Sequence, residues 1–430
     1  MNIPVRLPNE WPISVVLDTD IGTDIDDTWA LIMLLNLTEA RLHSVNARGA
    51  SSPRLPLIDL KLILTTFGNT EYRAKLVAQV LKSAGRLDVP IGIGSFSLLL
   101  LSVFSSGCFF LSGTKGKKAD NVQQHERGER IRAAVQDFDL ERDFVAHGGI
   151  LYHDGIEAFL EIVKEHECSN KEPLTLLCIG PCTNIAEALR RDPRMSERIN
   201  FVGMFGHLFP SSSASLSPSS SSTSDVVLPE YNVVKALEES KQVFNHHRWR
   251  SMTITPLDTC SHVRLKGELY QRIFSSLLHR SNEQLTKEDE GEGDRNKQVL
   301  QLLLEQYKVW LRDSNNEHVR KRYHFEEDEF LRQSSILFDT VAVLLCFSEA
   351  FLEMENSRLY VDDMGFTKVV CKEEEDAMME EAKNVVRCAT KWKDLDGYLE
   401  YLVRLLCKQG PFAYGDEEEE RMIKKKESRL

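Results

Sequence analysis

The sequence predicts an α/β protein with a mostly parallel, mixed central sheet that is flanked by helices. Short apolar runs of strand length alternate along the chain with amphipathic helical patterns, and glycine-containing turns separate them. An acid-rich stretch lies directly between the first apolar run and the first helical pattern. Because ligands in α/β folds bind at the carboxyl ends of strands, a functional site is expected at this stretch.

The strands and helices are predicted from the apolar character and period of each run. Residues 14–20 predict a buried strand, and a helical pattern follows at residues 27–35. Residues 60–66 predict the second strand, and residues 71–84 predict the next helix. The same patterns predict further strands at residues 174–179, 199–204 and 252–255, and helices at residues 155–165, 184–190 and 339–347.

One domain is expected over residues 12–405, followed by a charged tail at 406–430. Four segments within this domain look like insertions into a compact α/β unit. Each departs from such a unit in its own way, through length, apolar character, serine content or charge. They lie near residues 37–59, 95–120, 210–225 and 281–298, and the last is expected to be a solvated loop. The apolar and serine-rich segments have three open readings: a lid, a disturbance of the site, or errors in the deduced sequence.

Composition excludes several classes of function. The net charge of -13 leaves no basic excess to neutralise phosphates, so a nucleic-acid partner is not expected. Residues 89–114 carry no charge, but glycines and serines interrupt them, and a membrane-spanning helix needs about 20 predominantly apolar residues, so membrane insertion is not expected. Nine scattered cysteines without a Cys-x-x-Cys pair, and a beginning without a secretory signal, predict a cytoplasmic protein with reduced thiols.

The acid-rich stretch holds five aspartates, Asp18, Asp20, Asp24, Asp26 and Asp27. Carboxylates at this density repel one another unless a positive charge lies among them. A hard cation with oxygen ligands is therefore predicted, and Ca²⁺ suits the site better than zinc. The spacing fits neither an EF-hand loop nor the Asp-x-Asp-x-Thr pattern of aspartyl phosphotransferases.

Asp339 lies between the apolar residues 336–338 and 341–343. A carboxylate in such a setting costs several kcal/mol unless it is paired or bound to a metal. Asp339 is therefore a candidate ligand despite its distance along the chain.

Five motifs occur in an order that resembles the inosine–uridine-preferring nucleoside hydrolases. Residues 18–27 resemble the family's Asp-x-Asp-Pro-Gly-x-Asp-Asp signature, in a longer form. The other four motifs are residues 65–70 (Thr-Thr-Phe-Gly-Asn-Thr), 179–186 (Ile-Gly-Pro-Cys-Thr-Asn-Ile-Ala), 230–232 (Glu-Tyr-Asn) and 338–343 (Phe-Asp-Thr-Val-Ala-Val). Each motif is weak alone, but their common order is specific.

The resemblance implies Ca²⁺-dependent hydrolysis of a ribonucleoside to ribose and free base. It implies that Asp20, Asp27 and Asp339 bind the ion through their carboxylates and Ile179 through its backbone carbonyl. A small-molecule nucleoside is the partner it implies, and a homo-oligomer is compatible with it.

The resemblance also implies roles in catalysis and sugar binding. Asp26 would be the general base that activates water if the family's motif is aligned from the helix start. Asp24 is the alternative, because it takes the base position if the motif is aligned from Asp20. Asn69, Glu230 and Asn232 would hold the ribose hydroxyls. Asn184 is interpreted as a helix N-cap and no histidine is assigned a catalytic role.

Two departures from the family pattern keep other functions open. Phe338 stands where the family often has histidine, and Ser224 where it usually has asparagine. These changes weaken leaving-group protonation and sugar binding, so one alternative is a catalytically impaired homologue that acts as a binding or interaction protein. A less favoured alternative is a Mg²⁺ phosphatase with Asp18 as nucleophile.

Overall fold

A computed structural model of the chain describes most of the predicted domain. The described residues are 12–39, 58–95, 131–169, 172–210, 229–278, 287–312, 332–370 and 382–408. The predicted apolar and serine-rich insertions and the charged tail lie largely outside these ranges.

Eleven described strands form one sheet, in the order β4-β3-β2-β1-β5-β6-β8-β11-β9-β10-β7. Among these strands, β9 runs antiparallel to both of its neighbours, and the other pairs are parallel. The predicted mostly parallel, mixed sheet is therefore confirmed. The strands are β1 Ile13–Thr19, β2 Ile58–Thr65, β3 Ile91–Ile93, β4 Leu151–Tyr152, β5 Thr175–Cys178, β6 Asn200–Met204, β7 Leu208–Pro210, β8 Ser251–Thr255, β9 Leu352–Val361, β10 Thr367–Val369 and β11 Val385–Trp392.

The five strands predicted from the sequence are β2, β1, β5, β6 and β8, which are consecutive neighbours at the centre of the sheet. Strand β1 is apolar without alternation because both of its faces are covered. Val15 and Leu17 pack into one core and Val16 into the other, as the alternation of side chains along a strand requires.

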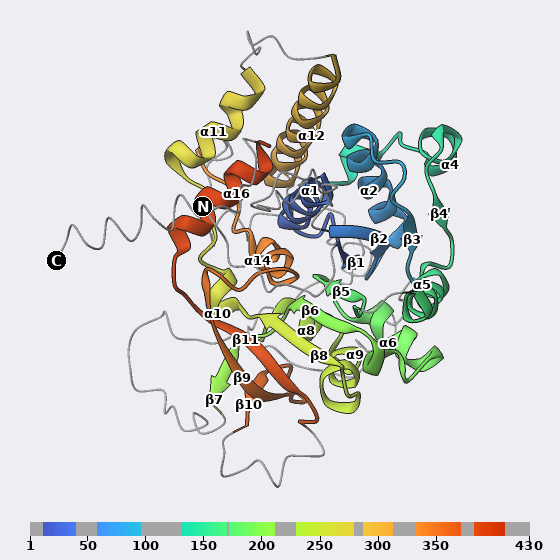
Figure 1. The fold of residues 1–430 in the computed structure, drawn as a ribbon, viewed down its shortest axis with the longest axis vertical. Helices are drawn as coiled ribbons and strands as arrows, with labels where there is room; N and C mark the ends of the chain where they lie inside the picture. Colours follow the sequence, from blue (N-terminus) through green and yellow to red (C-terminus); the bar gives the residue numbers. More distant parts are fainter. Residues whose placement is uncertain are drawn as a thin grey trace, which may run out of the picture.

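Helices cover both faces of the sheet (Figure 1). The first face is covered by α1 Asp26–Glu39, α2 Thr70–Ala84, α14 Phe338–Leu345 and α16 Leu395–Leu406, and α11 Gly267–Leu278 and α12 Lys287–Arg312 pack beyond them. The second face is covered by α5 Gly155–Ser169, α6 Thr183–Arg191 and α9 Leu237–Lys241. Shorter helices are η3 Arg132–Val135, α4 Leu140–Asp143, η4 Val145–His147, α7 Met195–Arg198, α8 Tyr231–Lys235, the π-helical η6 Gln242–His246 and α10 Leu257–Cys260.

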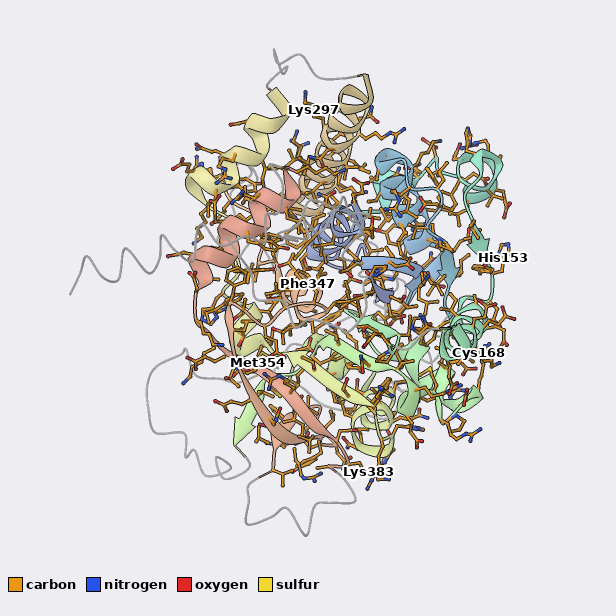
Figure 2. All side chains as sticks on the ribbon, in the orientation of Figure 1. His153, Cys168, Lys297, Phe347, Met354 and Lys383 are labelled. Carbon is orange, nitrogen blue, oxygen red and sulfur yellow. The ribbon has the colours of Figure 1, made fainter. Side chains whose placement is uncertain are left out.

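Helix α1 is enclosed rather than amphipathic. Every residue from its first turn to Leu37 is buried, including the two aspartates at its start. A helix that is covered on all sides belongs to the interior of the domain, and α1 lies between the sheet, α14 and α16. In Figure 2, Phe347 lies within the body of the molecule close to this region, whereas His153 and Lys383 lie at its periphery.

The prediction of a solvated loop at residues 281–298 is wrong from Lys287 onward, because α12 begins at that residue. Val299, Leu300 and Leu303 are buried at helical spacing and anchor α12 to the core. The charged stretch forms the first turns of this helix. Asn296 is also buried and donates a hydrogen bond to the Leu406 carbonyl at 3.2 Å. Across the described residues, no helix has the length and apolar character needed to cross a membrane.

Candidate functional site

The site lies at the carboxyl ends of the central parallel strands, as expected for this architecture. The acid-rich loop follows β1, and the predicted motifs at residues 65–70 and 179–186 follow β2 and β5. These loops contact each other: Thr66 donates from its backbone N–H to the Thr19 carbonyl at 2.9 Å, and its hydroxyl lies 2.8 Å from that of Thr183.

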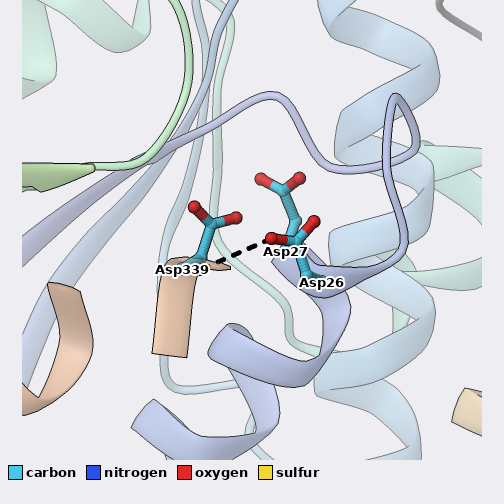
Figure 3. Close-up of side chains that lie close together, drawn as sticks. All are labelled: Asp26, Asp27 and Asp339. Atoms are coloured by element: carbon cyan, nitrogen blue, oxygen red, sulfur yellow. Dashed lines mark hydrogen bonds between the residues drawn. The ribbon is translucent and has the colours of Figure 1, made fainter. Parts of the chain in front are cut away.

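Three carboxylates from distant parts of the chain meet in this place. Asp26, Asp27 and Asp339 each offer an oxygen, and these oxygens lie within 4.8 Å of one another (Figure 3). The backbone N–H of Asp339 donates to Asp26 Oδ2 at 3.4 Å, across 313 positions of sequence. The structure therefore brings Asp339 beside the acid-rich loop. We refer to these three residues as the acid trio.

The acid trio is placed by two helix starts. Asp26 and Asp27 form the first turn of α1, and Asp339 lies in the first turn of α14, which packs against α1. Backbone N–H groups at a helix start are unsatisfied and favour negative charge, so two N-termini that converge create a place for several carboxylates. All three side chains are buried.

Burial and the charges of nearby carboxylates raise the pKa of each member of the trio well above its ordinary value. Burial is the largest cause for all three, and the charge of Asp24 adds to it at Asp26. For Asp339 the next causes are the charges of Asp26 and Asp27. A buried set of oxygen donors that resists ionisation unless a cation compensates fits a hard divalent ion.

The other predicted members of the acid-rich loop lie close to the trio. Asp20 is buried, and its charge acts on Asp27, Asp339 and Glu230. Asp24 is half-buried, and its Oδ1 accepts the backbone N–H of Ile25 at 2.7 Å. Asp24 is therefore adjacent to the trio but is not one of its members.

The predicted sugar-binding residues Glu230 and Asn232 are buried and are not ordinary surface polar groups. Glu230 caps α8 and accepts backbone N–H groups of Asn232 at 2.7 Å, Val233 at 3.1 Å and Gly206 at 3.3 Å. Burial raises the pKa of Glu230 to about 7. Asn232 donates to the Ile179 carbonyl at 3.3 Å, so the predicted sugar site and the predicted backbone ligand are in contact.

Asn69 lies on the opposite side of the acid-rich loop, at the start of α2. Its side chain accepts the backbone N–H of Tyr72 at 3.0 Å and caps the helix, and the residue is half-buried. The two residues before it, Phe67 and Gly68, both have positive φ, of 61° and 68°. Asn69 thus follows a tight turn, and the backbone geometry of this turn sets the position of the Asn69 side chain.

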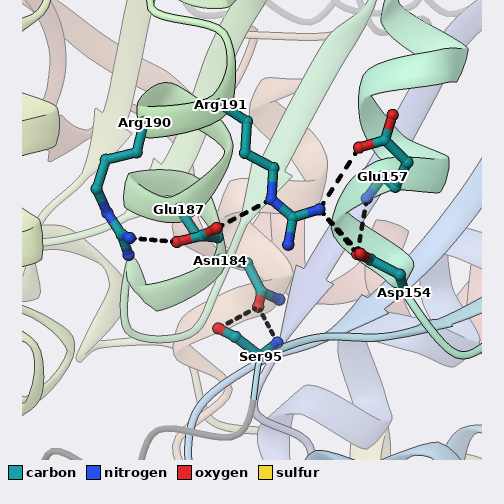
Figure 4. Close-up of polar contacts among 7 residues, drawn as sticks. All are labelled: Ser95, Asp154, Glu157, Asn184, Glu187, Arg190 and Arg191. Atoms are coloured by element: carbon teal, nitrogen blue, oxygen red, sulfur yellow. Dashed lines mark hydrogen bonds and ion pairs between the residues drawn. The ribbon is translucent and has the colours of Figure 1, made fainter.

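Asn184 has a different role from the predicted N-cap. Cys182 holds the N-cap position of α6, whereas the fully buried Asn184 donates to Asp18 Oδ1 at 2.8 Å and to the Thr65 carbonyl at 3.1 Å. Its oxygen accepts the backbone N–H of Ser95 at 3.0 Å (Figure 4). Asn184 therefore ties three strand ends together beneath the site.

A surface network on the same helix stabilises its far end. Arg191 forms ion pairs with Glu187 of α6, with Glu157 of α5 and with Asp154, which directly precedes α5 (Figure 4). Such exposed pairs contribute little individually, so we assign this network to the packing of α6 on α5 and not to the site.

Asp18 and Arg73 are buried charged residues beside the acid-rich loop, and the burial of these two side chains was not predicted from the sequence. Asp18 is fully buried, and burial raises its pKa to about 7. Arg73 is also buried and donates to backbone carbonyls of the acid-rich loop. A charged residue on an amphipathic helix gives no sequence signal that it is buried, because loops from elsewhere in the chain enclose it.

Comparisons with known proteins agree with this geometry. Residues 15–396 match the family described as inosine-uridine preferring nucleoside hydrolase. The chain is 25% identical over 197 residues to a protein named probable uridine nucleosidase 2 from Arabidopsis thaliana, covering 45% of this chain and 47% of that one. The chain thus spans about half the length of this curated relative.

Solved structures with the same fold are more distant in sequence. A plant nucleoside hydrolase, PpNRh1, superposes with a TM-score of 0.58 at 15% identity, covering 93% of this chain and 100% of that chain. An inosine-guanosine nucleoside hydrolase gives 0.57 at 16%, covering 92% and 98%. An inosine-uridine preferring nucleoside hydrolase from Bacillus anthracis gives 0.53 at 12%, covering 92% and 99%. At these identities the likeness shows the fold alone.

Proposed function

Because the chain belongs to the inosine-uridine preferring nucleoside hydrolase family, we propose that it hydrolyses the N-glycosidic bond of a ribonucleoside to give ribose and free base. The observation that carries this proposal is the convergence of Asp26, Asp27 and Asp339, whose carboxylate oxygens lie within 4.8 Å of one another at the carboxyl edge of the sheet. The active unit is proposed to be one domain over residues 12–405.

A calcium ion is the proposed cofactor. Asp20, Asp27 and Asp339 would hold it through their carboxylates and Ile179 through its backbone carbonyl, an all-oxygen set of the kind that Ca²⁺ prefers. When bound, the ion would supply a positive charge that orients water and the sugar hydroxyls. The burial of these carboxylates and their raised pKa values support this proposal, since a cation is what would let them ionise together.

Asp26 is the proposed general base. It belongs to the acid trio, and the Asp339 backbone N–H donates to one of its carboxylate oxygens, Oδ2, at 3.4 Å. A carboxylate in this position can take a proton from water. Asp24 is the weaker candidate because it lies outside the trio and its Oδ1 accepts the Ile25 N–H. Helix α1 fixes Asp26, whereas Asp24 lies in the loop before it.

Glu230, Asn232 and Asn69 are proposed to hold the ribose. Hydrolysis of a glycosidic bond passes through an oxocarbenium-like state, which is favoured by groups that orient the sugar and by nearby negative charge. Three backbone N–H groups fix the Glu230 carboxylate before substrate binds. The contact of Asn232 with the Ile179 carbonyl would couple sugar position to the ion.

A catalytically impaired homologue is the second candidate, and Phe338 favours it. The residue before Asp339 is the half-buried Phe338, which cannot protonate a leaving base. The phosphatase alternative is disfavoured because the Asp18 carboxylate is fully buried and accepts a hydrogen bond from Asn184. A nucleophile must be accessible to its substrate.

The test is ribose release by the full chain from a panel of purine and pyrimidine nucleosides and nicotinamide riboside, with Ca²⁺ in excess. The proposal expects release from at least one nucleoside, its loss with chelator and its loss in Asp26→Asn. Calcium binding without release from any substrate would establish the impaired homologue instead. A trapped phospho-aspartate at position 18 would overturn both.

A further inference from the structure

Arg73 lies in the first turn of α2 and is almost completely enclosed, with 1% of its surface exposed. Within the described part of the chain, its guanidinium donates hydrogen bonds to backbone carbonyls. Nε donates to the Phe67 carbonyl at 2.7 Å, and Nη1 donates to the carbonyls of Ile21, at 2.8 Å, and Asp20. A guanidinium retains its charge under all ordinary conditions, so a buried cation is fixed at this position.

The carbonyls that Arg73 binds belong to two different loops. Asp20 and Ile21 begin the acid-rich loop after β1, and Phe67 lies in the turn after β2 that ends at Asn69. The planar guanidinium donates to the two loops from two separate nitrogens in fixed geometry, whereas lysine would have to reach both from one nitrogen. One side chain therefore connects the proposed ion-binding loop with the proposed sugar-binding turn.

The turn that Arg73 holds has an unfavourable backbone. Phe67 is a non-glycine residue with φ of 61°, a conformation that persists only where surrounding contacts enforce it. The bond from Arg73 Nε to the Phe67 carbonyl and the bond from the Arg73 backbone N–H to the Asn69 carbonyl, at 3.3 Å, are two such contacts. Without the guanidinium, the turn loses a contact that keeps it bent.

The charge of Arg73 also reaches the acid trio, since it lowers the pKa of Asp27 against the larger opposing effect of burial. A fixed cation could act on a bound divalent ion in two opposite ways. It would repel the ion through space, or it would favour binding by holding the ligands in position. The hydrogen bonds to Asp20, Ile21 and Phe67 point to the second, because they act directly on the backbone that carries the ligands.

We propose that Arg73 is a positioning residue that fixes the acid-rich loop and the Phe67–Asn69 turn together, and thereby sets the affinity of the site for a divalent cation. This inference rests on the proposed function, and it adds a residue that touches neither the sugar nor the ion. It predicts that the ion site and the sugar site are coupled through one guanidinium.

The experiment measures Ca²⁺ affinity by titration calorimetry on the chelator-treated full chain, without substrate. We expect Arg73→Lys and Arg73→Gln to weaken Ca²⁺ binding by on the order of tenfold or more, as for other residues that orient metal ligands. The matched control is Arg86→Lys, beyond the far end of the same helix, where the arginine pairs with Asp88 at 2.8 Å. The control is expected to keep the wild-type affinity.

The outcomes separate this inference from the proposed function. Wild-type affinity in Arg73→Lys would overturn the positioning role of the guanidinium fork. Tighter binding in Arg73→Gln would also overturn it, and would show that charge repulsion dominates. A wild-type chain that binds no divalent cation would instead overturn the proposed function. Thermal unfolding in chelator shows whether each variant is folded.

If the Arg73 variants do not fold, Gly68→Ala tests the same coupling with the guanidinium kept. Gly68 has φ of 68° and lies beside Arg73 Nη2, which an added Cβ would approach to 3.6 Å. Because alanine disfavours this backbone, the turn should shift, and we expect weaker Ca²⁺ binding although Gly68 is no ligand. Unchanged Ca²⁺ affinity in Gly68→Ala would overturn the inference.

Discussion

Substitution of Asp18 by asparagine tests how the buried carboxylates contribute to stability. Asp18 is fully buried, and burial raises its pKa from 3.8 to about 7. A carboxyl with a raised pKa stabilises the folded protein at pH values below its unfolded pKa, and this contribution is lost as the pH rises through its folded pKa. Above pH 7 the wild-type chain must bury an ionised group, whereas Asp18→Asn buries a neutral one of nearly the same shape.

The size of the effect follows from the two pKa values. Each unit of difference corresponds to about 1.4 kcal/mol. Between pH 5 and pH 8, the free energy of unfolding of wild type should therefore fall by roughly 2–3 kcal/mol relative to that of Asp18→Asn. The hydrogen bond from Asn184 to Oδ1, at 2.8 Å, can be kept in the variant because the asparagine oxygen accepts in the same place.

The assay is urea unfolding of both proteins in chelator at several pH values, followed by circular dichroism. A difference in the free energy of unfolding that does not change with pH would refute the reasoning, since it would mean that Asp18 is ionised in the fold at low pH. The same variant should still release ribose from a nucleoside. Loss of all turnover in folded Asp18→Asn would revive the phosphatase alternative, in which this carboxylate is the nucleophile.

Three further predictions concern the site and the core. Asp26→Asn should lower the turnover number for ribose release by about 10²–10⁴-fold, as expected for the loss of a general base. Asp24→Asn should have a much smaller effect, and equal losses in the two variants would contradict the assignment of Asp26 as the base. Saturating Ca²⁺ should raise the free energy of unfolding of chelator-treated protein, by about 2.7 kcal/mol at one hundred times Kd, and an unchanged melting temperature would argue against an ion site. Trp29→Ala, in the first turn of α1, removes a fully buried side chain and should destabilise the fold by about 3–5 kcal/mol in chemical unfolding. A loss below about 1 kcal/mol would show that this end of α1 is not enclosed as described.

The sequence contained enough information to predict the centre of the sheet and much less to predict its edges. Strands β1, β2, β5, β6 and β8 are buried on both faces, so apolar runs identify them. Strand β9 mixes buried, half-buried and exposed residues without a clear period, and β3 and β10 have three residues each, too few to detect. Pairing partners supplied by the fold, and not local preference, define these strands outside the centre of the sheet.

Sequence reasoning also identified the acids that converge but not the groups that support them. Asp339 was recognisable because it interrupts an apolar run, where a lone carboxylate is costly. Arg73 was not, because on a helix with exposed and buried faces an arginine reads as a surface residue. Asn184 was misread because its neighbouring helix start suggested a cap, whereas its partners Asp18, Thr65 and Ser95 are far away in the chain.

The 313-residue separation between Asp26 and Asp339 has a consequence for synthesis of the protein. A nascent chain that has not yet extended past α14 carries only two of the three clustered carboxylates, whatever part of the sheet has already assembled. Loss of the C-terminal part, through early termination or a cut before α14, would therefore separate this acid from its companions. The protein is expected to acquire its ability to capture an ion only after α14 has been synthesised.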